Sequence, residues 1–218
     1  MEKLHQYNAL LVQHNQITNL TAHKTLEQSW LYNVQDSLLF NKEITPFFQD
    51  SNSLVKVLDI GSGGGCPAIP LKISFPEIDM TMIDSVGKKV NFLNEVVTEL
   101  RLVGIRAIHT RIEDFAKTNR ESFNIVTARA VAPMRTLLEY ALPFLKIGGV
   151  FLAFKGLNVA AEILDAKTAL AKLGGEIVQT KTAPFEDGAV RSLVIVKKVR
   201  GTPVQFPRGK NLPRLKPL

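Results

Sequence analysis

The sequence predicts an α/β fold with a largely parallel sheet, preceded by helices and followed by a tail. Three observations support this prediction. Residues 55–60 form a short apolar run that ends in glycines, helix-like and strand-like segments alternate after that run, and a short connection joins the last two strand-like segments. Strands that alternate with helices are typical of parallel sheets, whereas a short connection favours an antiparallel pair.

Length and composition limit the possible organisation of the protein. The 218 residues, of which 45% are hydrophobic, are enough for one sizeable α/β domain with small extensions. We expect a helical extension over residues 1–50 packed on the core, the sheet domain over residues 51–200, and a basic, proline-rich tail over residues 201–218.

The composition also argues against several classes of protein. No apolar run approaches the roughly 20 residues of a membrane span, and the first residues lack the basic start and apolar core of a signal peptide. The single cysteine, Cys66, suits a reducing cytoplasm, and the four histidines and one cysteine show no metal-ligand spacing. We therefore expect a cytoplasmic protein without a membrane anchor or a bound metal.

Positive charge is concentrated at the end of the chain. The formal net charge is +7, and eight basic residues but no acidic residue follow Gly188, so the rest of the chain carries a net charge of about −1. A basic tail of this kind often contacts nucleic acid. The alternative is a solvated terminus without a partner.

Two amphipathic helices are predicted before the first strand. Residues 2–16 place apolar side chains at helical spacing, and residues 19–22 interrupt the pattern. A second helix should start near Thr25, because Thr25 and Gln28 have the spacing of a capping box. The side chains expected to face the core are Leu4, Tyr7, Leu11 and Val12 in the first helix and Leu26, Trp30, Leu31, Val34 and Leu38 in the second.

The first strand, residues 55–60, is followed by a glycine turn. Gly61, Gly63 and Gly65 permit a tight turn and let a ligand approach bare backbone, and a helix should begin near Pro67. The dinucleotide fingerprint fails here, since its third glycine would fall on Cys66. The pattern acid-x-Gly-x-Gly-x-Gly, begun at Asp59, resembles the first motif of S-adenosylmethionine-dependent methyltransferases. The alternative is a generic turn between a strand and a helix.

The second strand, residues 80–84, ends in an acid. Asp84 at this position would accept hydrogen bonds from ribose hydroxyls, although it could instead cap the next helix, as Ser85 could. That helix, residues 86–100, carries Lys88 and Lys89 in its first turn, where positive charge opposes the helix dipole. The two lysines could serve an anionic partner or simply be solvated.

Two further strands deliver candidate site residues. After the third strand, residues 105–109, Glu113 or Asp114 could accept a hydrogen bond from an adenine amino group, or could be surface acids. The fourth strand, residues 123–128, runs into Arg129, at the edge of the sheet where ligands of open α/β proteins bind. A buried arginine without a function is uncommon, so we favour a functional role for Arg129.

The rest of the chain completes a seven-stranded sheet. We predict a helix over residues 134–145 that is ended by Gly148 and Gly149, a strand over 150–154, and a helix over 162–173. The last two strands, residues 177–180 and 192–199, should pair antiparallel. The tail from Gly201 is too rich in proline for regular structure, and we expect an extended arm that is at best partly ordered without RNA.

Residue types that are absent from the expected site limit which atom can accept the methyl group. Methylation of C5 of a pyrimidine requires a cysteine nucleophile, and the only cysteine lies in the glycine turn. Methylation of an exocyclic amine commonly uses an Asn/Asp-Pro-Pro-aromatic motif after the fourth strand. Residues 128–131 at that place read Ala-Arg-Ala-Val, so this chemistry is disfavoured. A ring nitrogen such as guanine N7 carries a free lone pair and needs only in-line placement. Because N7 faces a groove that is narrow in A-form RNA, the substrate would be a loop or an opened region.

Several motifs together resemble one family. They are Asn19-Leu20-Thr21-Ala22, Asp36-Ser37-Leu38, residues 59–65, Asp84-Ser85-x-x-Lys88-Lys89, Asn91-Phe92-Leu93, residues 127–132 and Thr202-Pro203 with Phe206-Pro207-Arg208. In this order they are similar to the RsmG family, also called glucose-inhibited division protein B. The resemblance implies the class I, Rossmann-like methyltransferase fold and S-adenosylmethionine as methyl donor. It also implies methylation of N7 of one guanosine, position 527, in the 530 loop of bacterial 16S rRNA.

The resemblance also implies site residues and partners. The family's cofactor contacts map onto Gly61, Cys66, Ile112, Glu113 and Arg129. With the residues discussed above, the expected cofactor site comprises Asp59, Gly61, Gly63, Gly65, Cys66, Asp84, Ser85, Ile112, Glu113 and Arg129, of which Arg129 is also the candidate catalytic residue. The expected RNA contacts are Lys88, Lys89, Lys155, Arg200, Arg208 and Lys210. The partner would be 16S rRNA or the small ribosomal subunit, bound by a monomer.

Two other functions remain open at this stage. One is a small-molecule methyltransferase, and the other is a non-catalytic RNA-binding protein with a relict cofactor pocket. For the leading function we expect Asp84→Ala to weaken cofactor binding. We further expect removal of the tail after Gly201 to spare cofactor binding and to weaken RNA binding.

Overall fold

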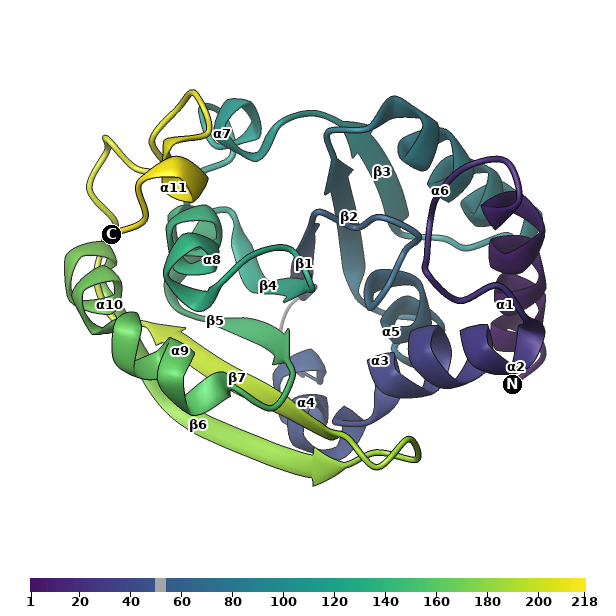
Figure 1. Cartoon of the computed structure of the whole chain (residues 1–218). Coiled ribbons are helices and arrows are strands. Elements are labelled where there is room, and N and C mark those ends of the chain that lie inside the picture. The colour runs from purple at the N-terminus through teal and green to yellow at the C-terminus, as the bar shows by residue number, and fades with distance from the viewer. Residues whose placement is uncertain (50–53) are drawn as a thin grey trace.

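A computed structural model describes residues 1–49 and 54–218, and the predicted domain boundary at residues 50 and 51 lies outside this part. The described residues form one seven-stranded sheet in the order β3-β2-β1-β4-β5-β7-β6 (Figure 1). All neighbours are parallel except β5–β7 and β7–β6, so the predicted terminal hairpin is confirmed. The strands are β1 (Lys56–Ile60), β2 (Asp79–Asp84), β3 (Ile105–His109), β4 (Phe123–Arg129), β5 (Leu145–Lys155), β6 (Gly175–Pro184) and β7 (Val190–Lys198).

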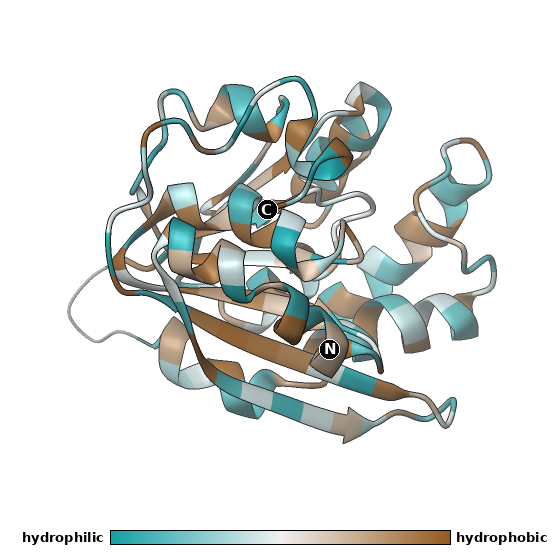
Figure 2. Ribbon diagram, turned by 60° about the vertical axis from the view of Figure 1, so that its left-hand side comes forward, coloured by the Kyte–Doolittle hydropathy of each residue, from teal (hydrophilic) through white to brown (hydrophobic). Residues whose placement is uncertain are grey.

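Helices cover both faces of the sheet because its strands are apolar on both sides. Val57 of β1 packs with residues of α1, α4, α5 and α6, and the next residue, Leu58, packs with residues of α8 and α10 on the other face. Figure 2 shows the hydrophobic strands between these layers. The helices are α1 (Glu2–Asn15), α2 (Leu26–Ser29), η1 (Trp30–Gln35), α3 (Asp36–Leu38), α4 (Asn41–Phe48), α5 (Ala68–Ser74), α6 (Gly87–Glu99), α7 (Ile112–Phe115), α8 (Met134–Ala141), η2 (Leu142–Phe144), α9 (Val159–Asp165), α10 (Lys167–Leu173) and α11 (Leu212–Leu215).

The order of the strands fixes where a ligand can bind. β1 lies between β2 and β4 and is parallel to both, so the chain reverses its direction of progress across the sheet at β1. Ligands of open α/β sheets bind beyond the carboxyl ends of the strands at such a switch point. In the part of the chain that the structure describes, no helix is both long and apolar enough to span a membrane.

Three details of the predicted elements are wrong. The second N-terminal helix contains a π-helical segment, η1, and Leu26 is half exposed rather than buried. Residues 134–144 are helical, as α8 followed by η2, but Gly148 and Gly149 do not end this helix and instead lie within β5, which starts at Leu145. These glycines serve the strand: a Cβ on Gly149 would lie 2.7 Å from the carbonyl oxygen of Asn124 in β4.

The tail is folded, which contradicts the expected extended arm. The guanidinium of Arg120 donates hydrogen bonds to the carbonyl oxygens of Thr202 (2.7 Å), Pro203 (3.3 Å) and Phe206. Phe206 and Pro213 of α11 are buried. Proline prevents regular pairing of the tail, but donors from the body of the protein satisfy its free carbonyl groups.

We expect Gly65→Ala to destabilise the protein more than Gly188→Ala. Both glycines have positive φ, +96° and +78°, so both replacements carry backbone strain of about 1–2 kcal/mol. Only at Gly65 would the new Cβ also collide, 2.5 Å from Cδ1 of the buried Ile69, which adds about 1–3 kcal/mol. Urea unfolding of both variants measures the difference, and equal losses of stability would contradict the prediction.

Candidate cofactor and substrate site

The glycine turn is fixed over the end of β2 by backbone hydrogen bonds. The N–H groups of Gly61 and Ser62 both donate to the carbonyl oxygen of Ile83, at 2.9 and 3.1 Å. Gly61 has a φ of +69°, and a Cβ there would lie 2.9 Å from Cγ2 of Val131. The turn therefore needs glycine both for its conformation and for the close approach of the loop after β4.

Asp84 joins this turn to the start of α6. Its Oδ2 accepts from the N–H of Gly63 and its Oδ1 from the N–H of Val86, both at 2.9 Å. Asp84 does not cap α6, the alternative left open by the sequence, because the N-cap residue of α6 is Val86 and no side chain among the described residues caps this helix. Each carboxylate oxygen can accept a further hydrogen bond, and Asp84 lines a cavity, so the capacity for ribose hydroxyls remains.

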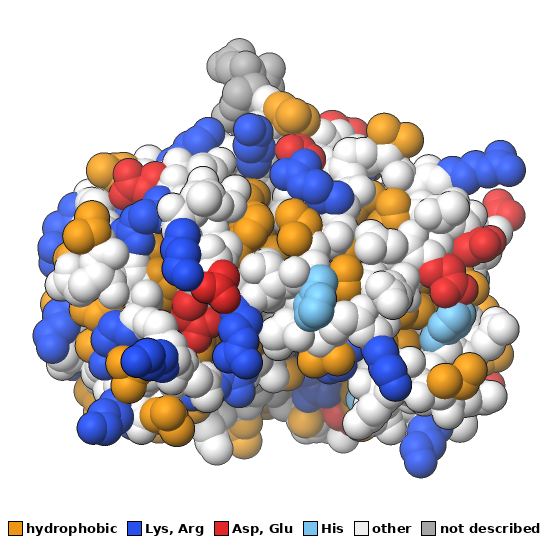
Figure 3. All heavy atoms as spheres, turned by 90° about the horizontal axis from the view of Figure 1, so that it is seen from above, with side chains coloured by type: hydrophobic (Ala, Val, Ile, Leu, Met, Phe, Trp, Pro, Cys, Tyr) orange, Lys and Arg blue, Asp and Glu red, His pale blue; other side chains and the backbone are white. Residues whose placement is uncertain are grey.

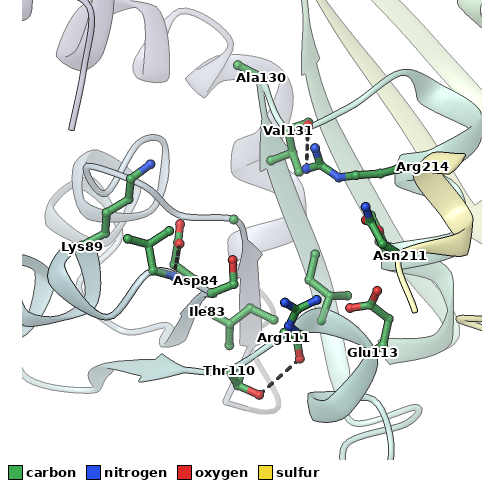
Figure 4. A pocket seen from close by; sticks show the side chains of 15 residues that line it. Ile83, Asp84, Lys89, Thr110, Arg111, Glu113, Ala130, Val131, Asn211 and Arg214 are labelled. Carbon is green, nitrogen blue, oxygen red and sulfur yellow. Dashed lines mark hydrogen bonds between the residues drawn. The ribbon is translucent and has the colours of Figure 1, made fainter. Parts of the chain in front are cut away.

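A cavity of about 420 Å³ lies beside Asp84 at the switch point (Figure 4). It brings together the predicted Gly61, Asp84, Ser85, Ile112 and Glu113, which come from three separate segments. Its far wall contains residues that we had not predicted: Val131, Tyr140, Asn211 and Arg214. We call this space the first cavity.

A second cavity, of about 400 Å³, adjoins the first and shares Gly61, Lys89 and Ala130 with it. The rest of the glycine turn, Cys66 and Arg129 line it, together with side chains from the region of α1 to α3. The two cavities extend across the carboxyl ends of β1, β2 and β4. Gly65 lines neither cavity, and its role is to let α5 approach the turn.

Arg129 lies at the end of β4 in a network of charged groups. Its Nη1 donates to the Oδ2 of Asp36 and to the carbonyl oxygen of Tyr32, both at 2.8 Å. The other oxygen of Asp36 accepts from Nε of Arg191 at 2.9 Å. Burial favours the neutral guanidine, but Cys66 and Asp36 hold the pKa of Arg129 above its usual value, so it stays a cation.

The environment of Cys66 argues against a nucleophilic role. The hydroxyl of Tyr7 donates to the carbonyl oxygen of Gly64 at 2.7 Å and lies 2.9 Å from the Sγ of Cys66. Burial raises the pKa of the Cys66 thiol, and only the thiolate is reactive. Tyr7 has the helical spacing typical of a core residue, and this spacing does not indicate its contact with the turn.

Asp59 is buried beneath the turn with an unsatisfied oxygen. Its Oδ1 accepts from the hydroxyl of Thr127 at 2.6 Å, whereas its Oδ2 has no partner among the described residues. Burial raises the pKa of Asp59 to about 6. Asp59 lines neither the first nor the second cavity, and a cationic ligand near the turn would favour its ionised carboxylate.

We expect Asp59 to make the protein less stable as the pH rises. Its pKa is about 6 in the folded protein against an ordinary value of 3.8, so the folded state binds more protons between these values. The contribution is lost from about pH 4 to pH 6 and amounts to about 3 kcal/mol. Urea unfolding at pH 4 and pH 7 should show this loss in the wild type but not in Asp59→Asn. An unchanged pH dependence in the variant would contradict the assignment.

The residues predicted to contact RNA occupy different environments. Lys88, Arg200 and Lys210 are exposed, and Lys89 is partly buried between the two cavities. The Nζ of Lys155 lies 2.6 Å from Glu162, and its side chain is only 10% exposed. Arg208 is bound to Glu139, and Arg200 donates to the carbonyl oxygen of Ala171. Roles in RNA binding stay predictions for all six, and at Lys155 and Arg208 the cation already has a protein partner.

The described residues offer no arrangement suited to a metal. No group of three or more His, Cys, Asp or Glu side chains is placed among them as ligands would be. The described residues instead form two adjoining cavities that are lined by Asp84, the start of α7, the glycine turn and the largely buried Arg129. With the strand order, these features define a class I S-adenosylmethionine-dependent methyltransferase.

Comparison with known proteins identifies the family. A family model described as rRNA small subunit methyltransferase G (GidB) matches residues 1–190. The chain is 42% identical over 216 residues to a Streptococcus agalactiae protein named ribosomal RNA small subunit methyltransferase G, covering 97% of this chain and 89% of that one. A protein of the same name from Oceanobacillus iheyensis is 40% identical over 221 residues, covering 100% and 90%. The chain belongs to the rRNA small subunit methyltransferase G family.

A solved structure supports the fold independently. Geranyl diphosphate C-methyltransferase from Streptomyces coelicolor, in complex with S-adenosyl-L-homocysteine, superposes with a TM-score of 0.56 at 13% identity. The match covers 72% of this chain and 74% of that one. At this identity the likeness concerns the fold alone, and it confirms the predicted methyltransferase sheet.

Proposed function

We propose that this protein transfers a methyl group from S-adenosylmethionine to N7 of one guanosine in the 530 loop of bacterial 16S rRNA, and that it acts as a cytoplasmic monomer. Family membership is the observation that carries the proposal. Bound S-adenosylmethionine would supply an electrophilic methyl group on a sulfonium. The protein has to hold this cofactor, orient a guanine and exclude water.

The two adjoining cavities suit the two halves of the cofactor. In the first cavity, Asp84 would accept hydrogen bonds from the ribose hydroxyls, and Glu113 with the backbone of Ile112 would bind the adenine. In the second cavity, the glycine turn and Arg129 would hold the methionine end, whose carboxylate pairs with a cation. The combined length and polarity of the cleft support this placement.

A third cavity, of about 270 Å³, offers a place for the target base. It shares Asp36, Arg129, Ala130 and Arg191 with the second cavity and continues to the ends of β5 and β7. Its arginines and Lys155 are donors, which suits the O6 of guanine, whereas Asp36 and Glu162 are acceptors, which suits the ring N–H and amino group. A splayed guanine would bring its N7 from this side toward the cofactor.

The chemistry of N7 matches the groups that are present. Guanine N7 has a lone pair and no proton, so transfer needs no general base. Arg129 stays charged and cannot act as one, and the thiol of Cys66 is not activated as a nucleophile. The demand is for positioning and for stable charges around the acceptor, and this is what the network of Arg129, Asp36 and Arg191 supplies.

RNA would approach the edge of the sheet that carries these cavities. Figure 3 shows the molecule from above relative to Figure 1, with basic side chains most frequent on the left of the view, where Figure 1 places the C-terminal tail. Phosphate groups of the loop would bind such a surface with an affinity that falls as salt rises.

Methyl transfer to defined RNA tests the proposal. Labelled S-adenosylmethionine is incubated with the protein and with small-subunit rRNA from cells that lack the activity, both as naked RNA and as intact subunits. We expect label in one of these forms at a single guanine, and no label when that base is changed. RNA from cells that possess the activity is the matched control and should accept little label. Cofactor binding without transfer to either form would contradict the rRNA assignment.

A further inference from the structure

We propose that the C-terminal tail is part of the cofactor site, with Asn211 and Arg214 contacting the adenosine half of S-adenosylmethionine. The inference rests on the proposed function only for the identity of the cofactor. Both residues line the first cavity together with Asp84 and Glu113. In Figure 4 they lie on the wall opposite Asp84, and Arg214 extends toward the cavity.

A buried ion pair fixes the tail on the body of the protein. Glu139 of α8 is fully buried, and its Oε1 accepts from the backbone N–H and the Nε of Arg208, both at 2.8 Å. Its Oε2 accepts from Nη2 of the same arginine at 2.6 Å. A buried carboxylate without a cation is strongly destabilising, so Glu139 requires the tail to stay in place.

Further contacts hold α11 against α8. The hydroxyl of Thr136 donates to the carbonyl oxygen of Pro213 at 2.9 Å, and Nη2 of Arg208 donates to that of Lys216 at 2.8 Å. These bonds lie on both sides of Asn211 and Arg214 in the sequence. The two side chains are therefore presented by an anchored segment and not by a free end.

The tail also contacts the loop that covers the glycine turn. Nη2 of Arg214 donates to the carbonyl oxygen of Val131 at 3.1 Å, and Val131 is the residue that packs against Gly61. On the same wall, Oδ1 of Asn211 lies 3.5 Å from the hydroxyl of Tyr140. The tail, the loop and the turn thus enclose one space from three sides.

The chemistry of the two side chains suits adenosine. The amide of Asn211 offers a donor and an acceptor, as the edge of adenine requires, and Glu113 adds an acceptor on the same wall. The guanidinium of Arg214 keeps donors beyond the bond to Val131 and can also stack on a base. This assignment reverses our expectation that loss of the tail would spare cofactor binding.

Binding measurements on full-length variants test the inference. We expect Asn211→Ala and Arg214→Ala each to raise the Kd for S-adenosylhomocysteine about tenfold, the effect of one hydrogen bond to a ligand. Lys216 in the same tail has an exposed side chain and provides the control, and Lys216→Ala should change the Kd less than twofold. Asn211→Ala and Arg214→Ala should weaken the affinity for 5′-methylthioadenosine by the same factor, because that probe retains the adenosine half. Unchanged affinities for both ligands would overturn the inference.

A second measurement uses the unaltered protein. Hydrogen exchange with and without S-adenosylhomocysteine should show slower exchange in residues 208–216 as well as in the glycine turn. Protection of the turn without protection of the tail would overturn the inference but leave the proposed function intact. Failure of the wild type to bind either ligand would overturn both, whereas failure of methyl transfer to rRNA with normal binding would affect the proposed function alone.

Discussion

Replacement of Arg129 by alanine should lower methyl transfer by about 100-fold or more, because the site loses a largely buried cation that lines both the second and the third cavity. It should also lower the free energy of unfolding by about 3 kcal/mol. The reason is that Asp36 and the carbonyl oxygen of Tyr32 would lose donors inside the protein. Arg191 still binds Asp36, so the loss should be near the lower end for a broken buried pair.

Two further variants separate these effects. Arg129→Lys keeps the positive charge, but a lysine has no planar guanidinium to reach both Asp36 and the carbonyl oxygen of Tyr32. This variant should therefore lose less of the free energy of unfolding than Arg129→Ala, but still lose most of the methyl transfer. Arg106→Ala is the matched control. Arg106 is exposed, and it makes a long ion pair of 3.7 Å with Asp79, which lies at the end of β2 away from the cavities. Its stability should change by less than about 1 kcal/mol. Near-normal transfer by Arg129→Ala would remove Arg129 from the site.

Replacement of Asp84 by alanine should raise the Kd for S-adenosylhomocysteine about 100-fold. Two hydrogen bonds from ribose hydroxyls to a carboxylate account for this factor at about 1.5 kcal/mol each. The glycine turn would loosen as well, because the N–H groups of Gly63 and Val86 would lose their acceptor. Calorimetric titration of the variant measures the affinity directly.

Asp79 is a control on the same strand. It lies at the other end of β2, away from the cavities, so Asp79→Ala should bind S-adenosylhomocysteine like the wild type. Asp84→Asn keeps one acceptor oxygen and should show an intermediate affinity. A normal affinity in Asp84→Ala would remove the ribose assignment and leave Asp84 with only its bonds to the backbone of Gly63 and Val86.

Local patterns explain why the sheet and half of the site could be predicted. The run before Gly61 is largely apolar because β1 is buried on both faces, and Gly61, Gly63 and Gly65 after it have positive φ. Asp84 follows from its position at the end of the second strand. Each of these signals lies within a few residues of the feature it predicts.

The parts that could not be predicted depend on contacts between distant segments. Glu139 and Arg208 are 69 positions apart, and neither shows in the sequence that it requires the other. The same holds for Asp36 and Arg191, which are 155 positions apart. A proline-rich tail without periodicity therefore resembled a free arm, although donors from the body hold it in place.

Glycine gave one misleading signal. Glycine pairs end many helices, and Gly148 with Gly149 was interpreted in this way. In the structure the same pair lies within β5, where the backbone approaches that of β4 and the register shifts. The local sequence does not distinguish these two uses, because both need a residue without a side chain.

The most direct test of the account is the position and chemistry of the methyl group on RNA. Small-subunit rRNA methylated by the purified protein is treated with borohydride and then aniline, which cleave the chain at N7-methylguanosine. We expect one new cut, at a single guanosine of the 530 loop, that is absent when S-adenosylmethionine is omitted or Arg129→Ala is used. Methyl incorporation without a cut, or a cut elsewhere in the RNA, would contradict it.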